Sequence, residues 1–367
     1  MVSSVVFHPA APQHPPVRSA PTGRPMGGRG RSADTLLVPR IPRVSTSESF
    51  RIAAVQAAPV FLDLDATVDK ACSLIETAAQ AGATLISFPE AFVPGYPLWV
   101  WFIPPGKTHP LRDLYSRLHR NSVTLDGPAV ARLVEAASDH SVTVAIGVNE
   151  RNSEASDSTL FNALLYLGDG RVLSRHRKLI PTAGERLVWG RAAGSDLEVL
   201  DLPFARVGGL LCWEHYMPLA RYTLVADGEQ IHVAPTWDRG EPWISSMRHV
   251  AKEGRCFVLG TCQAFHMDHI PDDLDFKSEY MSEVQGWVNP GLSLIVDPDG
   301  KIVAGPLDSE EGILYADVEP DQLVGPRWQL DGAGHYARPD VFELRVHAEE
   351  RPAIVRLGGA PKDAPPV

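Results

Sequence analysis

The sequence is poor in cysteine, and its apolar runs are short. Four cysteines in 367 residues are too few and too far apart for a disulfide scaffold. Cys256 and Cys262 lie in one strand-like run, which separates them by roughly 20 Å at about 3.3 Å per residue. Disulfide partners need Cα atoms within about 7 Å, so these two cannot form a bridge. No run approaches the ~18 consecutive apolar residues of a membrane span, and a reducing cytoplasm is the expected setting.

Positive charge is also scarce. The chain carries 34 Lys and Arg residues against 45 Asp and Glu residues, which gives a formal net charge of -11. No Lys/Arg run interrupts the body of the chain, and this argues against a nucleic-acid partner. A length of 367 residues is enough for one large domain or two ordinary ones with a sizeable core.

The two ends of the chain differ in composition from the middle. Residues 1–48 are rich in Pro, Ser, Gly and Arg, and no acidic residue precedes Asp34. They lack the compact apolar segment of a secretory signal, and their prolines argue against the amphipathic helix of a transit peptide. We therefore expect a disordered N-terminal tail over 1–48, an ordered domain over 49–345 and a loose C-terminal tail over 346–367.

Strands and helices alternate along the middle of the chain. The first strand is expected over Phe50–Pro59, followed by a helix that Asp65 caps and Gly82 ends, and by a buried strand over Thr84–Glu90. The alternation continues with helices over Pro128–Ser138 and Trp243–Lys252, strands over Val142–Val148, Ile231–Ala234 and Phe257–Thr261, and hairpins over Phe161–His176 and Ser293–Val303. The last hairpin is expected to close the core. This order predicts an α/β domain with mixed sheets covered by helices.

Cys212 stands at the junction of a strand and a helix. Val207–Leu211 is a short apolar run that predicts a buried strand, and the spacing from Trp213 onward is typical of a helix. The N–H groups and dipole at a helix start lower the pKa of a thiol and can hold an anion on a substrate. Glu214 is expected to be a structural partner near this helix start. The position suits a nucleophile, although a buried cysteine that only fills the core explains the local sequence equally well.

Two more reactive residues follow predicted strands. Glu90 ends the second strand, and Lys178 follows the second strand of the first hairpin. Sites of α/β folds commonly lie at strand ends, but each of these residues taken alone is more often a solvated side chain. Together with Cys212 they would supply a base, a cation and a nucleophile.

Three separated motifs surround these residues in a specific order. They are Phe-Pro-Glu90-Ala-Phe-Val-Pro-Gly-Tyr-Pro, Arg-Lys178-Leu-Ile-Pro-Thr-Ala-Gly-Glu185-Arg-Leu-Val-Trp-Gly and Leu-Cys212-Trp-Glu-His, with Ala-Pro-Thr-Trp237 and Gly334-His-Tyr-Ala-Arg-Pro-Asp340 further on. In these motifs the chain resembles the nitrilase branch of the carbon-nitrogen hydrolase superfamily, from about Phe50 to Leu344. The resemblance makes a purely structural role for Cys212 the weaker interpretation.

The resemblance implies a fold, a reaction and a set of site residues. The fold is a four-layer α-β-β-α sandwich. Glu90 corresponds to the family's general base, Lys178 to its cation and Cys212 to its nucleophile, with Glu185 as a second glutamate beside them. The backbone N–H of Trp213 would stabilise the developing anion. The expected reaction is the hydrolysis of an organic nitrile to a carboxylic acid and ammonia through a thioimidate and a thioester, with no metal and no cofactor, in a homodimer or a larger spiral homo-oligomer.

Other readings of the site stay open on the sequence alone. His215 could form a papain-like Cys-His pair with Cys212, but the resemblance assigns the base role to Glu90, so His215 is expected to line the substrate pocket or to pack. His266 and His269 lack further ligands with zinc-like spacing and are interpreted as loop residues. Related branches hydrolyse amides and carbamoyl compounds with the same three groups, so an amidase is the main alternative. A non-catalytic scaffold would have lost one of the three, and none is lost.

Aromatic residues give the main indication of substrate size. A set of Tyr96, Trp99, Trp101, Trp237 and Trp243 would suit an aryl or arylaliphatic nitrile if several of its members line one pocket. They could equally fill the core or a subunit interface, and then aliphatic nitriles and cyanide remain candidates. Trp213, directly after the nucleophile, resembles nitrilases rather than amidases. The predicted binding residues are Tyr96, Trp213, His215 and Trp237.

Overall fold

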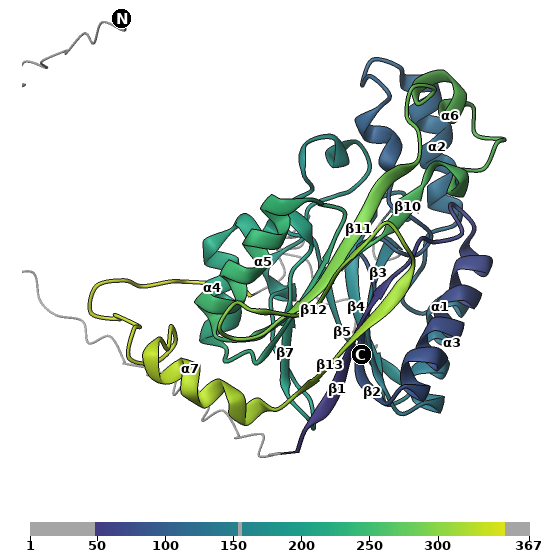
Figure 1. The fold of residues 1–367 in the computed structure, drawn as a ribbon. Helices are drawn as coiled ribbons and strands as arrows, with labels where there is room; N and C mark the ends of the chain where they lie inside the picture. The colour runs from purple at the N-terminus through teal and green to yellow at the C-terminus, as the bar shows by residue number, and fades with distance from the viewer. Residues whose placement is uncertain (1–47, 153–155, 349–367) are drawn as a thin grey trace, which may run out of the picture. The chain divides into compact units, whose positions relative to one another are not determined.

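Two β-sheets form the centre of the structure (Figure 1). The structure is a computed structural model that describes residues 48–152 and 156–348. The first sheet has the strand order β13-β1-β2-β3-β4-β5, with β13 at Gly312–Val318, β1 at Phe50–Gln56, β2 at Ala83–Ser87, β3 at Thr143–Arg151, β4 at Leu160–Gly168 and β5 at Arg171–Arg177. Strands β1, β2 and β3 run parallel, whereas the other neighbours pair antiparallel.

The second sheet has the order β10-β11-β9-β8-β7-β6, and β12 pairs with β11. Its strands are β6 at Leu200–Asp201, β7 at Arg206–Gly209, β8 at Ile231–Thr236, β9 at Phe257–Cys262, β10 at Ala264–His266, β11 at Trp287–Val296 and β12 at Ile302–Asp308. Strands β7, β8 and β9 run parallel, and the other pairs are antiparallel. Both sheets are therefore mixed, as the sequence predicts.

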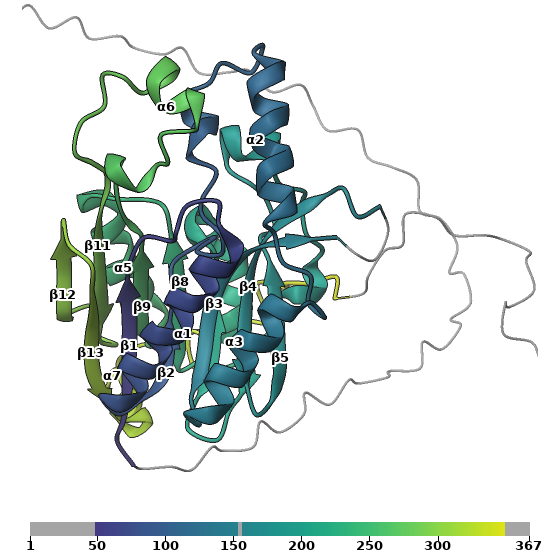
Figure 2. The same ribbon diagram turned by 90° about the vertical axis from the view of Figure 1, so that its right-hand side faces the viewer.

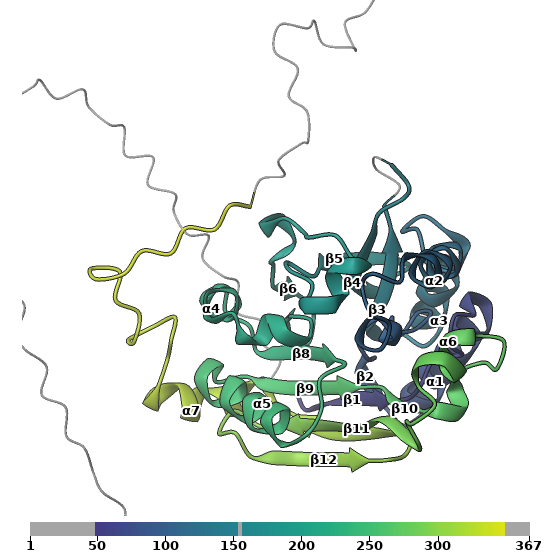
Figure 3. The ribbon, with the colours of Figure 1, turned by 90° about the horizontal axis from the view of Figure 1, so that it is seen from above.

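Helices cover the outer face of each sheet. Helices α1 (Leu64–Gln80) and α3 (Pro128–Asp139) lie on the first sheet, and α4 (Pro218–Ala226) and α5 (Glu241–Gly254) lie on the second (Figure 2, Figure 3). This is the predicted α-β-β-α sandwich. At the end of the sandwich near the functional site lie α2 (Thr108–Arg120) and α6 (Asp275–Tyr280), while α7 (Val324–Gln329) follows the last strand. Short 3-10 helices connect these elements: η1 Leu98–Trp101, η2 Ala183–Leu187, η3 Gly194–Asp196, η4 Cys212–Tyr216, η5 Met267–His269 and η6 Pro320–Leu323.

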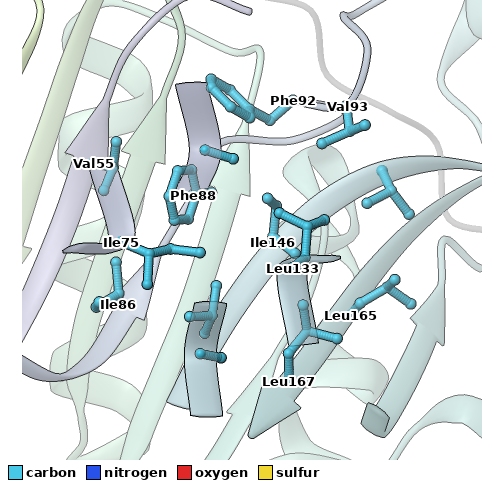
Figure 4. Close-up of a cluster of buried hydrophobic side chains, with 14 of the residues drawn as sticks. Val55, Ile75, Ile86, Phe88, Phe92, Val93, Leu133, Ile146, Leu165 and Leu167 are labelled. Carbon is cyan, nitrogen blue, oxygen red and sulfur yellow. The ribbon is translucent and has the colours of Figure 1, made fainter. Parts of the chain in front are cut away.

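Three apolar clusters hold the four layers together. The first, which we call the outer core, joins α1 and α3 to the first sheet and includes Ile75, Leu133 and Ile146 (Figure 4). The second contains inward-facing residues of both sheets, and the third packs α5 on the second sheet. Burial of one such side chain contributes about 1.5–3 kcal/mol, so the layers are stabilised mainly by apolar area.

Local chemistry explains where the first helix starts. Asp63, and not the predicted Asp65, is the N-cap of α1, because its extended backbone lets the side chain accept a hydrogen bond from the N–H of Ala66 at 3.0 Å. Asp65 lies inside the first turn instead. Gly82 follows the end of the helix with a φ of +86°, which confirms its predicted role as the stop.

The segment after Cys212 is not the start of an α-helix. Residues Cys212–Tyr216 form η4, and α4 begins only at Pro218. Proline lacks an N–H and fits the first position of a helix, so it starts a new element here. The predicted helix from Trp213 was therefore wrong in its start, and Cys212 does not stand at the N-terminus of an α-helix.

Strand β13 was missed, and the prediction that the hairpin β11–β12 closes the core was wrong. Residues Gly312–Val318 return to the first sheet and pair antiparallel with β1. Of the predicted tails, only residues 48 and 346–348 fall within the described residues, and the domain boundaries at 49 and 345 stay predictions. None of the helices in the described ranges is long and apolar enough to cross a membrane.

Candidate active site

Three chain segments bring charged side chains to one buried point. Glu90 lies in the turn after β2, Lys178 follows β5, and Cys212 starts η4 after β7. The Lys178 ammonium donates hydrogen bonds of 2.8 Å to Oε1 of Glu90 and of 2.8 Å to Oε2 of Glu185. All four side chains belong to residues at most 4% exposed. The structure thus brings together the four residues that the sequence predicts as catalytic, which we call the catalytic cluster.

The Glu90 carboxylate has one oxygen that is fully occupied. Its Oε1 accepts from Lys178 and, at 2.7 Å, from Nδ2 of Asn162, whereas its Oε2 accepts only the backbone N–H of Trp237 at 2.8 Å among the described contacts. A carboxylate oxygen offers about two acceptor sites, so Oε2 keeps one for a proton. Burial raises the pKa of Glu90, and the charge of Lys178 offsets only part of that effect.

Two neutral residues that hold Glu90 were missed by the sequence analysis. Asn162 comes from the middle of β4, and Gln263 donates from Nε2 to the backbone carbonyl of Glu90 at 2.8 Å. Both are fully or almost fully buried. A polar residue inside an apolar strand needs a buried partner, and this signal could have identified Asn162.

Glu185 is fixed by its own local turn and by a tyrosine. In η2 its Oε2 accepts the N–H of Thr182 at 2.7 Å, which forms a capping box. The hydroxyl of Tyr96 donates to Oε1 at 2.7 Å, and the indole N–H of Trp101 donates to that hydroxyl at 3.0 Å. Burial and then the Glu185 charge raise the pKa of Tyr96 well above its usual range, so the hydroxyl keeps its proton as a donor.

Cys212 has an unusual backbone conformation and a protonated thiol. Its φ of +52° lies in the left-handed region, which is uncommon for a residue other than glycine. Burial and then the charge of Glu90 raise the pKa of the Cys212 thiol well above its usual range. Burial also works against the charged form of Lys178, but the carboxylates of Glu90 and Glu185 outweigh it and raise the pKa of Lys178, which stays an ammonium.

The ligand-type atoms of Glu90, Glu185 and Cys212 lie within 4.8 Å of one another, which is close enough for a shared metal ion. The ammonium of Lys178 already lies between the two carboxylates, 2.8 Å from an oxygen of each. A cation supplied by the chain therefore takes the place that a metal ion would need. His266 and His269 are not part of such a group among the described residues, and the Nδ1 of each accepts a hydrogen bond from a backbone N–H of their own turn.

Glu214 ties the Lys178 segment to the Cys212 segment. Its carboxylate accepts from the N–H of Leu179 at 2.6 Å, from the N–H of Leu211 at 2.7 Å and from Nε2 of His176 at 2.9 Å. Burial alone would raise the pKa of Glu214, but the charge and hydrogen bond of His176 outweigh it and lower that pKa. Glu214 is thus a structural partner as predicted, although it joins two strand ends rather than an α-helix start.

His215, predicted as a binding residue, does not line the cavity beside Cys212. The residue is 1% exposed, and its ring turns away to contact the carbonyl of Cys212 and the ring of His232. The turn of η4 thus places this side chain in the interior, where it contacts Cys212 through its backbone carbonyl and not through the cavity. This placement corrects the binding prediction and leaves the second predicted possibility, that His215 packs in the interior.

A cavity of about 490 Å³ opens on Cys212 and Glu185. Its aromatic lining consists of Tyr96, Trp101, Phe102, Trp213, Trp237 and Trp287. The rings of Tyr96 and Trp237 are stacked with centroids 4.5 Å apart. Of the predicted aromatic set, Trp99 and Trp243 are buried in the core instead. The sequence analysis missed Trp287, which comes from the start of β11.

The fold and this site define a hydrolase of carbon-nitrogen bonds other than peptide bonds. The family model described as carbon-nitrogen hydrolase matches residues 51–325, and the chain belongs to that family. Within it, the chain falls in the nitrilase branch. An aliphatic nitrilase of Sinorhizobium fredii is 40% identical over 308 residues, which cover 83% of this chain and 98% of that protein. Nitrilase 1 of Arabidopsis thaliana is 38% identical and covers 85% and 90%.

Solved structures support the fold. The crystal structure of Saccharomyces cerevisiae Nit3, a member of branch 10 of the nitrilase superfamily, aligns with a TM-score of 0.60 at 19% sequence identity. The alignment covers 79% of this chain and 97% of that chain. At this level of identity the likeness concerns the arrangement of the layers and strands.

Proposed function

We propose that this protein is a nitrilase, which hydrolyses an organic nitrile to the carboxylic acid and ammonia. The observation that carries the proposal is the catalytic cluster, in which Lys178 pairs with Glu90 and Glu185 beside the Cys212 thiol. The cluster opens on an aromatic cavity that can hold a small apolar substrate. The similarity to proteins named nitrilases, at up to 40% identity, supports the same reaction.

In the first step, Sγ of Cys212 attacks the nitrile carbon while its proton passes to Glu90. A nitrile carbon is a poor electrophile and requires a thiolate. The raised pKa of Cys212 keeps the resting group a thiol, so deprotonation must accompany the attack. Oε2 of Glu90 is the accepting atom, because Oε1 is already bonded to Lys178 and Asn162.

The attack places negative charge on the nitrile nitrogen. The ammonium of Lys178 and the backbone N–H of Trp213 stabilise this charge, and one proton returns from Glu90 to the nitrogen to give a neutral thioimidate. Glu90 then takes a proton from a water that attacks the thioimidate carbon and passes this proton to the nitrogen. The hydroxyl of the resulting tetrahedral intermediate gives its proton to the nitrogen as well, the C–N bond breaks, and ammonia leaves. The remaining thioester is hydrolysed by a second water with the same base, which releases the acid and restores the thiol.

Glu185 and Tyr96 support this chemistry from outside the reacting atoms. Glu185 holds Lys178 in place and balances its charge, and Tyr96 fixes Glu185. The stacked rings of Tyr96 and Trp237, with Trp213 nearby, offer flat apolar surfaces to the substrate. This lining favours an aryl or arylaliphatic nitrile.

The test is ammonia release from phenylacetonitrile, benzonitrile, an aliphatic dinitrile, cyanide and the matching amides, with wild type beside Cys212→Ala. We expect turnover of a nitrile to its acid by wild type and none by the variant. Turnover of amides alone would make the protein an amidase that uses the same groups. Equal activity of Cys212→Ala on nitriles would contradict the proposed nucleophile.

We further propose that the protein forms homodimers or larger spirals through the surface of η4 and α4. Besides Trp213, which lines the cavity, three apolar side chains there are exposed, namely Tyr216, Leu219 and Tyr222. Exposed apolar groups gathered on one surface mark association sites. Light scattering during gel filtration should give at least twice the monomer mass, and Leu219→Glu should lower it.

The cytoplasm is the setting we propose, because Cys212 must stay reduced to act. The structure contains all four cysteines as free thiols. We also propose that the domain over 49–345 carries the whole activity. A chain that lacks residues 1–48 should keep the kcat of the full chain, and a loss of turnover would contradict this boundary.

A further inference from the structure

Behind Cys212, three buried side chains form a continuous hydrogen-bonded chain. Nδ1 of His215 lies 2.6 Å from the carbonyl oxygen of Cys212, and Nε2 of His215 lies 2.8 Å from Nε2 of His232. Nδ1 of His232 lies 3.0 Å from Oε2 of Glu229. None of the three residues is more than 1% exposed. We call this chain of groups the rear relay.

The contacts of the rear relay fix where its protons lie. The carbonyl oxygen of Cys212 only accepts, so Nδ1 of His215 carries a hydrogen. Burial and then the neighbouring His232 hold the pKa of His215 well below its usual range, so this ring is neutral and its Nε2 is an acceptor. Nε2 of His232 must then donate to it.

The fold makes room for the relay and anchors its far end. Gly208 of β7 has no side chain, and a Cβ there would lie 2.5 Å from Oε2 of Glu229. The carbonyl of Glu229 accepts from Arg327, and its N–H donates to Leu224 at 3.1 Å. Trp243 packs edge-on against the ring of His215, with ring centroids 5.2 Å apart. The relay is therefore held on several sides, as a group that orients another must be.

We propose that His215, His232 and Glu229 are positioning residues, which orient the peptide between Cys212 and Trp213 as the anion-binding donor. The inference rests on the proposed function. This peptide is trans, so its C=O and N–H point in opposite directions. When the relay holds the carbonyl, the N–H is aimed into the cavity. Donation to the carbonyl also polarises the peptide and strengthens its N–H as a donor.

The backbone of Cys212 has a conformation that the rear relay can help to maintain. A φ of +52° costs free energy for a residue with a side chain and persists only where the surroundings maintain it. The hydrogen bond from His215 acts on the carbonyl of this same residue. Loss of the bond would let the peptide rotate, and the thiol would then attack without a fixed donor for the new charge.

The test is a matched pair of polar substitutions at His215. In His215→Asn the side-chain N–H₂ can take the place of Nδ1 and keep the bond to Cys212. In His215→Gln the amide lies one bond further out, where it reaches His232 instead. We expect kcat on the preferred nitrile to stay within about threefold of wild type for His215→Asn and to fall about 10²-fold for His215→Gln, the loss typical of a missing oxyanion donor. KM should not change in either variant, and an equal or reversed order of kcat would overturn the proposal.

A second readout separates positioning from general damage. Methyl methanethiolsulfonate transfers a methylthio group to the Cys212 thiolate and releases methanesulfinate, so no charge develops at the anion site. The rate at which the Cys212 peptide is modified, followed by mass spectrometry, should be the same in wild type and both variants. A rate that falls in parallel with kcat would overturn the proposal.

The wild type tests the relay even if a variant fails to fold. In ¹⁵N spectra of histidine-labelled protein, with ¹³C at the cysteine carbonyls to identify His215, we expect a neutral ring protonated at Nδ1. A ring protonated at Nε2 instead would overturn the proposal. Because this measurement needs no turnover, it is independent of the nitrilase assay. If the wild type were inactive on every nitrile and amide, the proposed function would be wrong, but the tautomer of His215 could still be measured and would still test the rear relay.

Discussion

The outer core and the catalytic cluster are buried to the same degree but differ completely in chemistry. In the outer core, Ile75 and Leu133 are 0% exposed and touch other apolar side chains. In the catalytic cluster, Glu90 and Lys178 are 0% and 1% exposed and carry charges. The outer core stabilises the protein through apolar area, which each side chain contributes separately. In the cluster, each charge stabilises a charge of opposite sign beside it, so the removal of one charge leaves another buried without its partner.

The difference shows that burial alone does not tell whether a side chain serves stability or catalysis. An apolar interior needs only shape and volume, and many sequences supply these. A buried ion pair is weak evidence for stability, since hydrophobic residues of similar volume often do as well. Lys178 between two carboxylates is therefore better explained by chemistry than by folding.

The sharpest way to separate the two regions is to remove the thiol of Cys212, the proposed nucleophile. Cys212→Ala should lower the rate of nitrile hydrolysis by more than about 10⁴-fold, because a nucleophile acts as a unit with its base and cation. Stability should change by less than about 1 kcal/mol, as the side chain lost is small and uncharged. Ammonia release and urea unfolding of the same preparation measure both. Residual turnover near the wild-type rate would contradict this prediction.

Removal of the central cation should damage activity and stability together. Lys178→Met leaves Glu90 and Glu185 facing each other, which should abolish turnover and cost about 3–5 kcal/mol in the free energy of unfolding. Adding Glu185→Gln to this variant should restore part of the stability but none of the activity. Urea unfolding of both single variants and the double variant measures the coupling. Strictly additive free energies would mean that the cluster behaves like the outer core.

The opposite result is expected in the outer core. Leu133→Ala should lower the free energy of unfolding by about 2–5 kcal/mol, while kcat at a temperature where the variant is folded should equal that of wild type. Leu133→Met keeps the volume and should cost less than about 1.5 kcal/mol. Thermal unfolding and initial rates test the pair. A fall in kcat for the folded Leu133→Ala would show that the two regions are coupled.

The smallest expected effect concerns pH. In its proposed role as the base, Glu90 must be deprotonated, and burial raises its pKa. Activity is therefore present above this pKa and lost as the pH falls through it, so the acid limb of kcat/KM should lie above the ~4.3 of an ordinary glutamate. Asn162→Ala removes a hydrogen bond that lowers this pKa and should move the limb to higher pH by less than about one unit. A shift to lower pH would contradict the assignment of Glu90 as the base.

What the sequence could predict depends on the range of the interactions involved. Strands and helices with strong periodicity, such as α3 and the hairpin β4–β5, lie where they were expected. The positions of Glu90, Lys178 and Cys212 follow from strand ends and family motifs. Asn162 was missed because its partner Glu90 is 72 residues away. A polar residue within an apolar strand indicates that it has a buried partner, but it does not indicate which residue that partner is.

Local competition explains the other differences. Asp63 and Asp65 are both good caps by residue type, and only the backbone conformation decides between them. The aromatic residues near the site look alike in the sequence, yet Trp101 lines the cavity and Trp99 is buried in the core. His215 follows Cys212 by three residues along the chain, but the tight turn of η4 places its ring against His232 and not in the cavity.

The pairing of β1 with β13 means that the first sheet can be completed only late in synthesis on the ribosome. Strand β1 matches seven residues of β13 and only four of β2, although β13 is made more than 250 residues later. Until Val318 has left the ribosome, one long edge of β1 offers free N–H and C=O groups to any passing strand. Synthesis proceeds from the N-terminus at about 5–20 residues per second. The edge of β1 therefore stays unpaired for most of the time that the chain is being made. Chaperones that cover such edges should therefore raise the yield of folded protein.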